Sequence, residues 1–383
     1  MKILGVLVGA ILIIGALIFF VILPPRVDDR MNVVIDHAPY DVSAEAHALH
    51  DTLQVADLHA DTLLWMRDPS KRQSRGQTDL PRLREGGVRL QVFTAVTKTP
   101  KNLNYDENDA GSDDITLLAI AQRWPIRTWR SIFERALYQA SRLDRLESTA
   151  GDDFIFVKSA SDLQHALIGN ALAGVYGIEG AHPLEGDVAN IDKLYDAGLR
   201  VMGLQHFFDN ELGGSLHGQS GAGLTDFGKA AVDAAVARGM IIDIAHSSEQ
   251  VVRDVLARNE KPVIVSHTGL KGHCDSPRNI SDALMQEIAD RGGLIGVGFW
   301  DGAICSPTPE GIAGAIAYAV DLLGADHVAL GSDFDGTVTT PFDASELAAL
   351  TQALMEEGLN SETIRAVMGG NAIRFFLENL PAA

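Results

Sequence analysis

Short apolar segments alternate with amphipathic helical patterns along most of this 383-residue chain, and the alternation constrains its fold more than any other feature. Strands separated by helices are typical of parallel sheets joined by helical crossovers. Eight repeats favour a closed (β/α)8 barrel of the TIM type, an α/β fold, over an open doubly wound sheet. No Gly-x-Gly-x-x-Gly motif follows the first strand to indicate a dinucleotide site. The expected strands are residues 53–58, 88–96, 173–178, 200–205, 240–245, 262–266, 293–299 and 327–332.

The longest excursion from this pattern lies between the second and third strands. Ile115 to Leu146 carries a helical pattern that includes Trp124, Trp129 and Phe133. These aromatic residues are most simply explained by packing, and a lid over the substrate is the alternative.

The composition indicates one large acidic domain. Hydrophobic residues make up 46% of the chain, enough for a single barrel of roughly 250 residues with insertions. We expect one catalytic domain over residues 46–383. The formal net charge of −20 argues against nucleic acid as a partner, because phosphates would be repelled. With only Cys274 and Cys305, the chain has no CxxC metal motif, and we expect a barrel that does not rely on disulfides, although one bond between the two is left open.

Residues 1–25 form the clearest compositional break. Ile3 to Leu23 is a run of 21 residues without a charge, followed by Pro24-Pro25-Arg26. A helix of that length spans about 30 Å of hydrocarbon and exceeds the core of a signal peptide. We expect a transmembrane anchor, with a cleaved signal segment as the alternative. A polar linker is expected over residues 26–45, and the catalytic domain is expected on the periplasmic or extracellular side.

Seven ionisable side chains fall at the C-terminal ends of six of the expected strands. In a (β/α)8 barrel that end gathers the active site from the loops that follow the strands. A His and an Asp two residues apart at a strand end point to the same side and can reach one metal ion. Each residue alone is equally well explained as a structural histidine or a solvated carboxylate, but together they predict an active site. The seven are His59, Asp61, Glu179, His206, His246, His267 and Asp333.

Several short stretches around these residues form a specific combination. They are Asp57 to Asp61, Gly177 to Gly180, Gln205-His206, Asp243 to Ser247, Val265 to His267, Arg278-Asn279, Gly331 to Gly336 and Gly370 to Arg374. In this order, over roughly residues 50 to 380, the chain resembles the membrane dipeptidase (renal dipeptidase) family of zinc peptidases.

The resemblance implies two zinc ions per chain. His59 and Asp61 match ligands of one ion, and His246 and His267 match ligands of the other. Glu179 matches the carboxylate that bridges the two ions. The residue types agree with this, because imidazoles and carboxylates suit zinc and a shared carboxylate holds two cations about 3.5 to 4 Å apart.

The resemblance also implies hydrolysis of dipeptides with a free C-terminal carboxylate by a water that the two ions activate. His206, Arg278 and Asp333 match positions that bind the substrate. Asp333 would carry the proton from the water to the leaving amine, and His206 would donate to the developing oxyanion, which makes these two the expected catalytic residues. The expected partners are dipeptides, the membrane and a second copy of the chain in a homodimer.

Five other residues resemble members of the expected metal-binding and substrate-binding site. His182 and His217 are expected to be solvated loop residues, with a supporting role in the site as the alternative. Asp335 shares a turn with Asp333. We expect Asp333 to be the site residue, because it follows the strand directly. Asp57 either accepts a hydrogen bond behind the site or simply ends its strand. Trp300 stands where animal members of the family carry Tyr.

Three classes of function are compatible with these features. The first is a dizinc dipeptidase, the second is a related amidohydrolase or deaminase that acts on a non-peptide substrate, and the third is a non-peptidase tailoring protein that keeps the barrel. Fold alone does not separate the first two. The complete ligand set argues against an inactive protein, and Arg278 argues for a substrate with a carboxylate.

Overall fold

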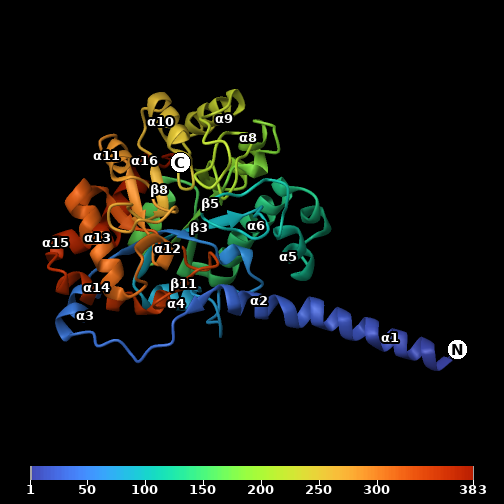
Figure 1. Cartoon of the computed structure of the whole chain (residues 1–383). Helices are drawn as coiled ribbons and strands as arrows, with labels where there is room; N and C mark the ends of the chain where they lie inside the picture. Colours follow the sequence, from blue (N-terminus) through green and yellow to red (C-terminus); the bar gives the residue numbers. More distant parts are fainter. Residues whose placement is uncertain (1, 383) are drawn as a thin grey trace.

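Eight parallel strands close into a barrel in the computed structural model, which describes residues 2–382 (Figure 1). They are β2 (Val55–Ala60), β3 (Val88–Val96), β5 (Leu172–Glu179), β6 (Leu199–Gly203), β7 (Ile241–Asp243), β8 (Ile264–Thr268), β9 (Leu294–Val297) and β10 (Val328–Leu330). The hydrogen-bonded order is β3-β2-β10-β9-β8-β7-β6-β5, and pairing of β3 with β5 closes the ring. The TIM-type fold and all eight expected strands are confirmed.

Three further strands lie outside the barrel. β4 (Phe154–Val157) pairs with the first half of β5, and β1 (Val33–Val34) pairs with β11 (Thr339–Thr340). The sequence pattern does not indicate them, because segments of two to four residues carry too little periodicity to be recognised.

Helices surround the barrel and join successive strands (Figure 1). Many begin at a serine, threonine or aspartate whose side chain accepts a hydrogen bond from the first turn, as do Ser159, Thr225, Ser248 and Thr308. The helices of the body are α3 (Ala44–His50), α4 (Leu80–Glu85), α5 (Ile115–Ala121), α6 (Ile132–Ala150), α7 (Ala160–Gly169), α8 (Asn190–Asp196), α9 (Asp226–Ala237), α10 (Glu249–Arg258), α11 (Asp282–Ala289), α12 (Asp301–Ile304), α13 (Pro309–Leu323), α14 (Leu347–Glu356), α15 (Ser361–Arg365) and α16 (Asn371–Asn379).

A buried apolar cluster takes residues from all eight barrel strands, for example Ala56, Val92 and Val201. Phe375 and Phe376 of α16 belong to the same cluster, and α16 contacts β2, β9 and β10. This helix therefore packs against the end of the barrel opposite to the loops that carry the ionisable residues, and leaves the carboxyl ends of the strands open to a site.

The insertion between β3 and β5 is not one helix. α5 ends at Ala121, a 3₁₀ turn spans Ile126–Trp129 after Pro125, and α6 follows. Trp124 is buried between these elements and Trp129 packs against the same cluster, which confirms the packing role expected for these aromatic residues.

One long helix at the N-terminus projects away from the body (Figure 1). α1 (Lys2–Leu17), a π turn (Ile18–Ile22) and α2 (Leu23–Met31) continue into one another. Residues Ile3–Met31 are long and apolar enough to cross a membrane. The linker expected over residues 26–45 is therefore helical as far as Met31, because the prolines fall at the first positions of α2, where their missing N–H groups are tolerated.

Candidate metal centre

Glu179, the last residue of β5, lies among the imidazoles of four histidines. Its Oε1 is 3.1 Å from His246 Nε2, 3.3 Å from His267 Nε2 and 3.7 Å from His59 Nε2. Its Oε2 is 3.2 Å from His206 Nε2. All five residues are buried, so one carboxylate faces the Nε2 atoms of four imidazoles in a site shielded from water.

His59 also connects Glu179 to two further carboxylates. Its Nε2 lies 3.5 Å from Asp61 Oδ1 and 3.8 Å from Asp333 Oδ1. Three overlapping triads, in each of which the ligand atoms lie within 4.8 Å of one another, unite the seven residues singled out from the sequence. The triads are His59, His267 and Asp333; Glu179, His206 and His246; and His59, Asp61 and Glu179.

Hydrogen bonds behind this cluster orient its members. Ser266 Oγ lies 3.1 Å from His59 Nδ1 and 2.9 Å from His267 Nδ1, and Thr94 donates to Asp61 Oδ1 at 2.5 Å. With Nδ1 engaged, the Nε2 atoms are directed into the cluster. Sequence reasoning does not find Ser266 or Thr94, although both lie near the carboxyl ends of their strands, where supporting residues of a barrel site gather.

The backbone of the site is strained at two of its members. His246 and Asp333 both have a φ of 60°, in the left-handed region that residues other than glycine rarely adopt. Such conformations cost on the order of 1–3 kcal/mol and persist only where the surrounding structure enforces them. Here they turn both side chains into the cluster at the ends of β7 and β10.

Burial favours the neutral form of most of these groups. It raises the pKa of Glu179 well above its usual range, with a further contribution from Asp61, and raises that of Asp333 to about 8. It lowers the pKa of His246 well below its usual range, and the charge of Arg278 adds to this. A cation at this point would reverse the balance for the carboxylates and bind the neutral imidazoles through their lone pairs. The convergent nitrogen and oxygen donors therefore fit a divalent metal ion.

Arg278 lies beside the histidines with part of its guanidinium unused. Nη2 donates to the carbonyl of His267 at 2.9 Å and lies 3.4 Å from His246 Nε2, whereas buried Nη1 has no hydrogen-bond partner within residues 2–382. The guanidinium carbon lies 5.3 Å from the centre of the Trp300 ring, whose Nε1 donates to Tyr105 at 2.9 Å. The free edge of Arg278 is thus available to an anionic group of a ligand.

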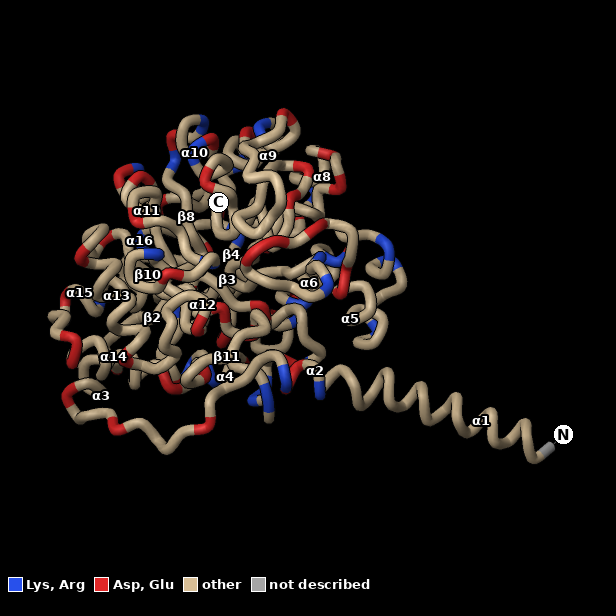
Figure 2. Tube along the Cα trace, in the orientation of Figure 1, with Lys and Arg blue, Asp and Glu red and all other residues tan. Residues whose placement is uncertain are grey.

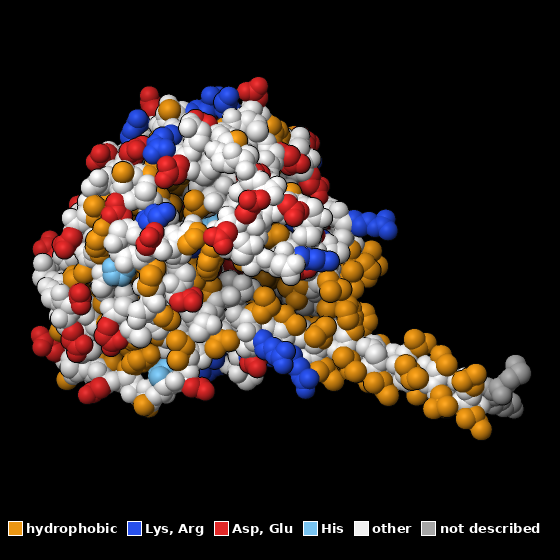
Figure 3. Space-filling model, in the orientation of Figure 1, with side chains coloured by type: hydrophobic (Ala, Val, Ile, Leu, Met, Phe, Trp, Pro, Cys, Tyr) orange, Lys and Arg blue, Asp and Glu red, His pale blue; other side chains and the backbone are white. Residues whose placement is uncertain are grey.

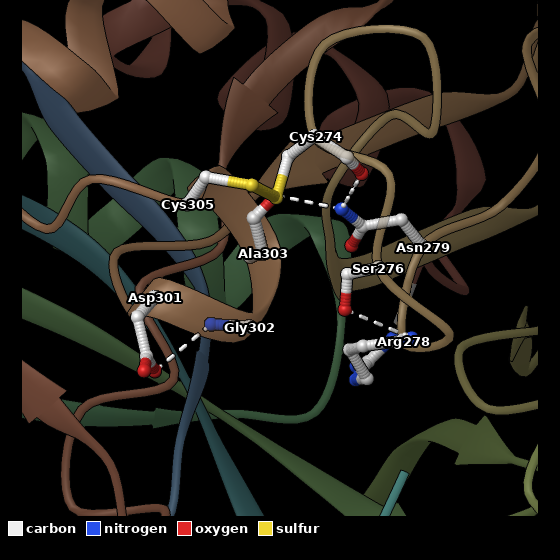
Figure 4. The surroundings of a disulfide bond; sticks show 8 residues. All are labelled: Cys274, Ser276, Arg278, Asn279, Asp301, Gly302, Ala303 and Cys305. Atoms are coloured by element: carbon white, nitrogen blue, oxygen red, sulfur yellow. Dashed lines mark hydrogen bonds between the residues drawn. A yellow bond between two sulfur atoms is a disulfide. The ribbon is translucent and has the colours of Figure 1, made fainter. Parts of the chain in front are cut away.

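A disulfide joins the two loops that carry Arg278 and Trp300. Cys274 and Cys305 are bonded, so the one disulfide that the sequence leaves open is present (Figure 4). Asn279 strengthens the junction by donating to the carbonyls of Cys274 at 2.9 Å and Ala303 at 2.8 Å. Two cysteines 31 residues apart show no local pattern, which is why the sequence leaves their pairing open.

Two neighbours of the seven residues are structural supports. Asp335 accepts hydrogen bonds from Gln77 N and Thr78 Oγ1 and pairs with Arg67, whose Nη2 lies 2.7 Å from it. Asp57 accepts from the amide and hydroxyl of Ser332, at 2.8 and 2.7 Å, directly before Asp333. Both carboxylates hold the loop that follows β10.

His182 and His217 are buried, so the expectation that they are solvated loop residues is wrong. His182 packs on Phe208, with ring centres 4.7 Å apart, and His217 stacks on Phe207 at 4.9 Å. Neither belongs to the metal-binding triads.

A cavity of about 600 Å³ opens onto the cluster. Residues at its base include Asp61, Glu179, His206, Arg278 and Asp333. The groups expected to bind metal and those expected to bind substrate thus border the same cavity.

A TIM-type barrel whose carboxyl-terminal face holds buried nitrogen and oxygen ligands defines a metal-dependent barrel enzyme. The family described as membrane dipeptidase (peptidase family M19) matches residues 43–380, and the chain belongs to this family of metallo-dipeptidases.

Its relatives agree with this assignment. A dipeptidase of Aspergillus terreus, ataJ, is 29% identical over 328 residues, which are 78% of this chain and 76% of the relative. The structure of dipeptidase AC has a TM-score of 0.71 at 25% identity and covers 87% of this chain and 100% of its own. A metallopeptidase from Rhodobacter sphaeroides, solved with a phosphinate mimic of the dipeptide L-Ala-D-Ala, has a TM-score of 0.71 at 24% identity, with coverages of 86% and 100%.

Proposed function

We propose that this metallo-dipeptidase holds two zinc ions and hydrolyses dipeptides that carry a free C-terminal carboxylate. The position of Glu179 carries the proposal, because its Oε1 lies 3.7 Å from His59 Nε2 and 3.1 and 3.3 Å from the Nε2 atoms of His246 and His267, so one carboxylate lies between both proposed ligand pairs. His59 and Asp61 would share one ion with Glu179. His246 and His267, whose Nε2 atoms lie 2.9 Å apart and beside Glu179 Oε1, would share the other. Nitrogen and oxygen donors without a thiolate suit zinc.

When bound, the ions would lower the pKa of water and polarise the carbonyl of the scissile amide. Asp333 would accept the proton of the attacking water and return it to the leaving amine. Its Oδ1 lies 3.8 Å from His59 Nε2 and its side chain lines the cavity, so it would lie close to both the water and the leaving amine. His206 would donate from its imidazole to the oxyanion that develops on the amide carbonyl.

Arg278 would hold the C-terminal carboxylate of the substrate. Its free Nη1 is buried, and its Nη2 lies 3.4 Å from His246 Nε2, so a carboxylate bound to this guanidinium would lie near the scissile bond. That short distance leaves room for a single residue beyond the bond and selects dipeptides over longer peptides. The phosphinate mimic bound by the Rhodobacter sphaeroides protein is a ligand of this kind.

The helix Ile3–Met31 would anchor the enzyme in a membrane, with the barrel in the periplasm or outside the cell. The bond between Cys274 and Cys305 favours this side, because disulfides persist in oxidising compartments. A homodimer stays a prediction.

The test is metal analysis combined with hydrolysis by the full-length protein in detergent. We expect about two zinc ions per chain, loss of dipeptide hydrolysis on chelation, and recovery when zinc is returned. Cleavage of non-peptide amides with no cleavage of any dipeptide would replace the proposal by the amidohydrolase alternative.

A further inference from the structure

The N-terminal helix contributes one side of the active-site cavity. Leu23, Pro24, Val27 and Met31 of α2 line the same cavity as the ligands at its base. Leu23 is also the last residue of the uncharged run. The segment that leaves the apolar helix is therefore part of the wall that a substrate would touch.

This wall is held in place by polar contacts rather than lying loosely on the body. Asp28 of α2 is buried and lies 3.0 Å from Arg67 Nε and 2.8 Å from Arg75 Nε. Asn32 donates to Asp28 at 2.9 Å and accepts from the amide of Thr337 at 3.0 Å. Pairing of β1 with β11 continues the attachment beyond the helix.

The part of the cavity lining that adjoins α2 is apolar. Leu64 and Ile115 are buried there in one cluster, against which Val27 packs. Leu103 and Leu117 line the same cavity, yet 41% and 58% of their surfaces are exposed. Figure 3 shows hydrophobic side chains continuing from the projecting helix onto the adjoining surface of the body. Large aliphatic side chains left open around a catalytic cavity are typical of a site for an apolar ligand group.

The two ends of the cavity differ in chemistry. Arg278 lies beside His246 and His267, whereas Leu64 lies beside Asp61, to whose carbonyl its amide donates at 2.9 Å. A dipeptide whose carboxylate reaches Arg278 across the metal ligands would extend its N-terminal residue toward Leu64 and α2.

We propose that α2 forms the specificity wall of this enzyme, which selects dipeptides whose N-terminal residue carries an extended alkyl group. The inference rests on the proposed function, because it takes Arg278 as the site of the substrate carboxylate. Val27 of α2 and Leu117 of α5 are the lining residues that would contact the alkyl group.

The position of the wall also sets where such a substrate is taken up. Arg26 and Arg30 of α2 are exposed one turn apart, directly after the uncharged run, where arginines of an anchored helix contact lipid headgroups. Figure 2 shows basic positions where the projecting helix meets the body. The cavity lined by Leu23 then opens at the membrane surface. A dipeptide with an alkyl group could enter a cavity at this position either from the aqueous phase or from the lipid interface.

The test compares alanine dipeptides whose N-terminal residue is alanine, norvaline, norleucine or 2-aminodecanoic acid. For wild-type full-length protein in detergent, we expect kcat/KM to rise about two- to fourfold per added methylene until the cavity is filled. Val27→Ser and Leu117→Ser should each lower the ratio of long-chain to short-chain kcat/KM by about tenfold. Ile168→Ser, on α7 and 80% exposed, is the matched control and should leave the ratio unchanged.

Binding gives a readout independent of turnover, because Trp65 and Trp300 line the cavity. Free 2-aminodecanoic acid should change tryptophan fluorescence at lower concentration in wild type than in either variant. Leu117 is largely exposed, so Leu117→Ser keeps the test valid if Val27→Ser fails to fold.

The remaining arm repeats the dipeptide series with the protein in phosphatidylcholine vesicles. If kcat/KM of the 2-aminodecanoic acid substrate alone is higher in vesicles than in detergent, that substrate is taken up from the lipid interface. If kcat/KM rises with chain length equally in vesicles and in detergent, it is taken up from the aqueous phase. The specificity wall alone would be overturned by either of two results. Wild type could cleave Ala-Ala with no rise in kcat/KM along the series, or the long-chain to short-chain ratio of kcat/KM could be equal in wild type and both variants. Failure to cleave any dipeptide would overturn the proposed function itself.

Discussion

Asp28 and Arg67 form a buried ion pair between the N-terminal helix and the loop after β2, with Arg67 Nε 3.0 Å from Asp28 Oδ2. The same guanidinium reaches Asp335, with Nη2 2.7 Å from Oδ1. Asp335 follows Asp333 by two residues in the loop after β10. One arginine thus connects the N-terminal helix to the loop that carries the expected proton carrier.

Asp28→Asn should destabilise the full-length protein by about 2–4 kcal/mol. The change leaves the positive charge of Arg67 buried with one carboxylate instead of two, and breaking a buried pair on one side is strongly unfavourable. Denaturant unfolding in detergent measures the effect. Asp29→Asn, at the exposed neighbouring position, is the control and should stay within about 0.5 kcal/mol of wild type. Equal stability of both variants would show that the pair does not hold α2.

Glu179→Gln should lose at least one metal ion per chain and nearly all turnover. An amide lacks the charge that stabilises two cations, and only its one oxygen can act as a ligand. Elemental analysis after dialysis measures the metal content. Glu211→Gln, on the surface, should keep the wild-type content. A Glu179→Gln protein that still holds two ions and turns over would remove Glu179 from the bridging position.

The barrel and the positions of the expected ligands can be predicted from the sequence for one physical reason. A buried parallel strand reads as an apolar run, and the residue that ends it must lie on the catalytic face. The positions of Glu179 at the end of β5 and His267 in β8 follow from this rule alone. Their roles as ligands remain part of the proposal.

What the sequence did not reveal depends on contacts between distant residues. α2 is attached through the ion pair of Asp28 with Arg67, which is distant in sequence, and local periodicity does not predict such a pair. His182 looked like a solvated loop residue because loops are polar on average, yet it is buried through packing on Phe208. Long-range pairs and aromatic packing of this kind become visible only when the chain is folded.

Stability should fall in mild acid partly because of His182. Burial lowers the pKa of its imidazole to about 3, against about 6.5 in an unfolded chain. Between these values the unfolded state takes up a proton and the folded state does not, so the free energy of unfolding falls as the pH drops below about 6.5. The limiting slope for one group is about 1.4 kcal/mol per pH unit.

Urea unfolding between pH 7 and pH 5 measures that slope. His182→Gln should show a shallower decline than wild type, whatever its stability at pH 7. His165→Gln, at an exposed position of α7, is the control and should keep the wild-type slope. The assignment fails if His182→Gln and wild type decline in parallel.

Removing the disulfide should weaken both the fold and the substrate site. Cys305→Ser opens a crosslink between residues 31 positions apart, which lowers the free energy of unfolding by about 2–4 kcal/mol. KM for a dipeptide should rise more than kcat falls, because Arg278 and Trp300 lie on the two loops that the bond joins. A phosphine reductant should bring wild type to the level of the variant and leave the variant unchanged. A wild type unaffected by reduction would assign both positions a packing role only.

Arg278 should decide between a dipeptide and its C-terminal amide. A carboxylate paired with the buried guanidinium gains a charge-assisted hydrogen bond that the amide cannot form, a difference of about 1.5–3 kcal/mol. Wild type should therefore prefer the free acid by roughly 10- to 150-fold in kcat/KM, and Arg278→Ala should lose most of this preference. Arg278→Lys should also be impaired, because a point charge cannot reproduce the planar fork.

The control is Arg291→Ala, which removes an exposed arginine after α11 and should leave the preference intact. Measuring the acid-to-amide ratio within each protein cancels differences in metal content and in the fraction of active enzyme, since both substrates meet the same preparation. A ratio in Arg278→Ala equal to that of wild type would place the carboxylate elsewhere. No substrate group would then be assigned to the part of the cavity beside His246. Arg278 would no longer explain why the enzyme selects dipeptides over longer peptides.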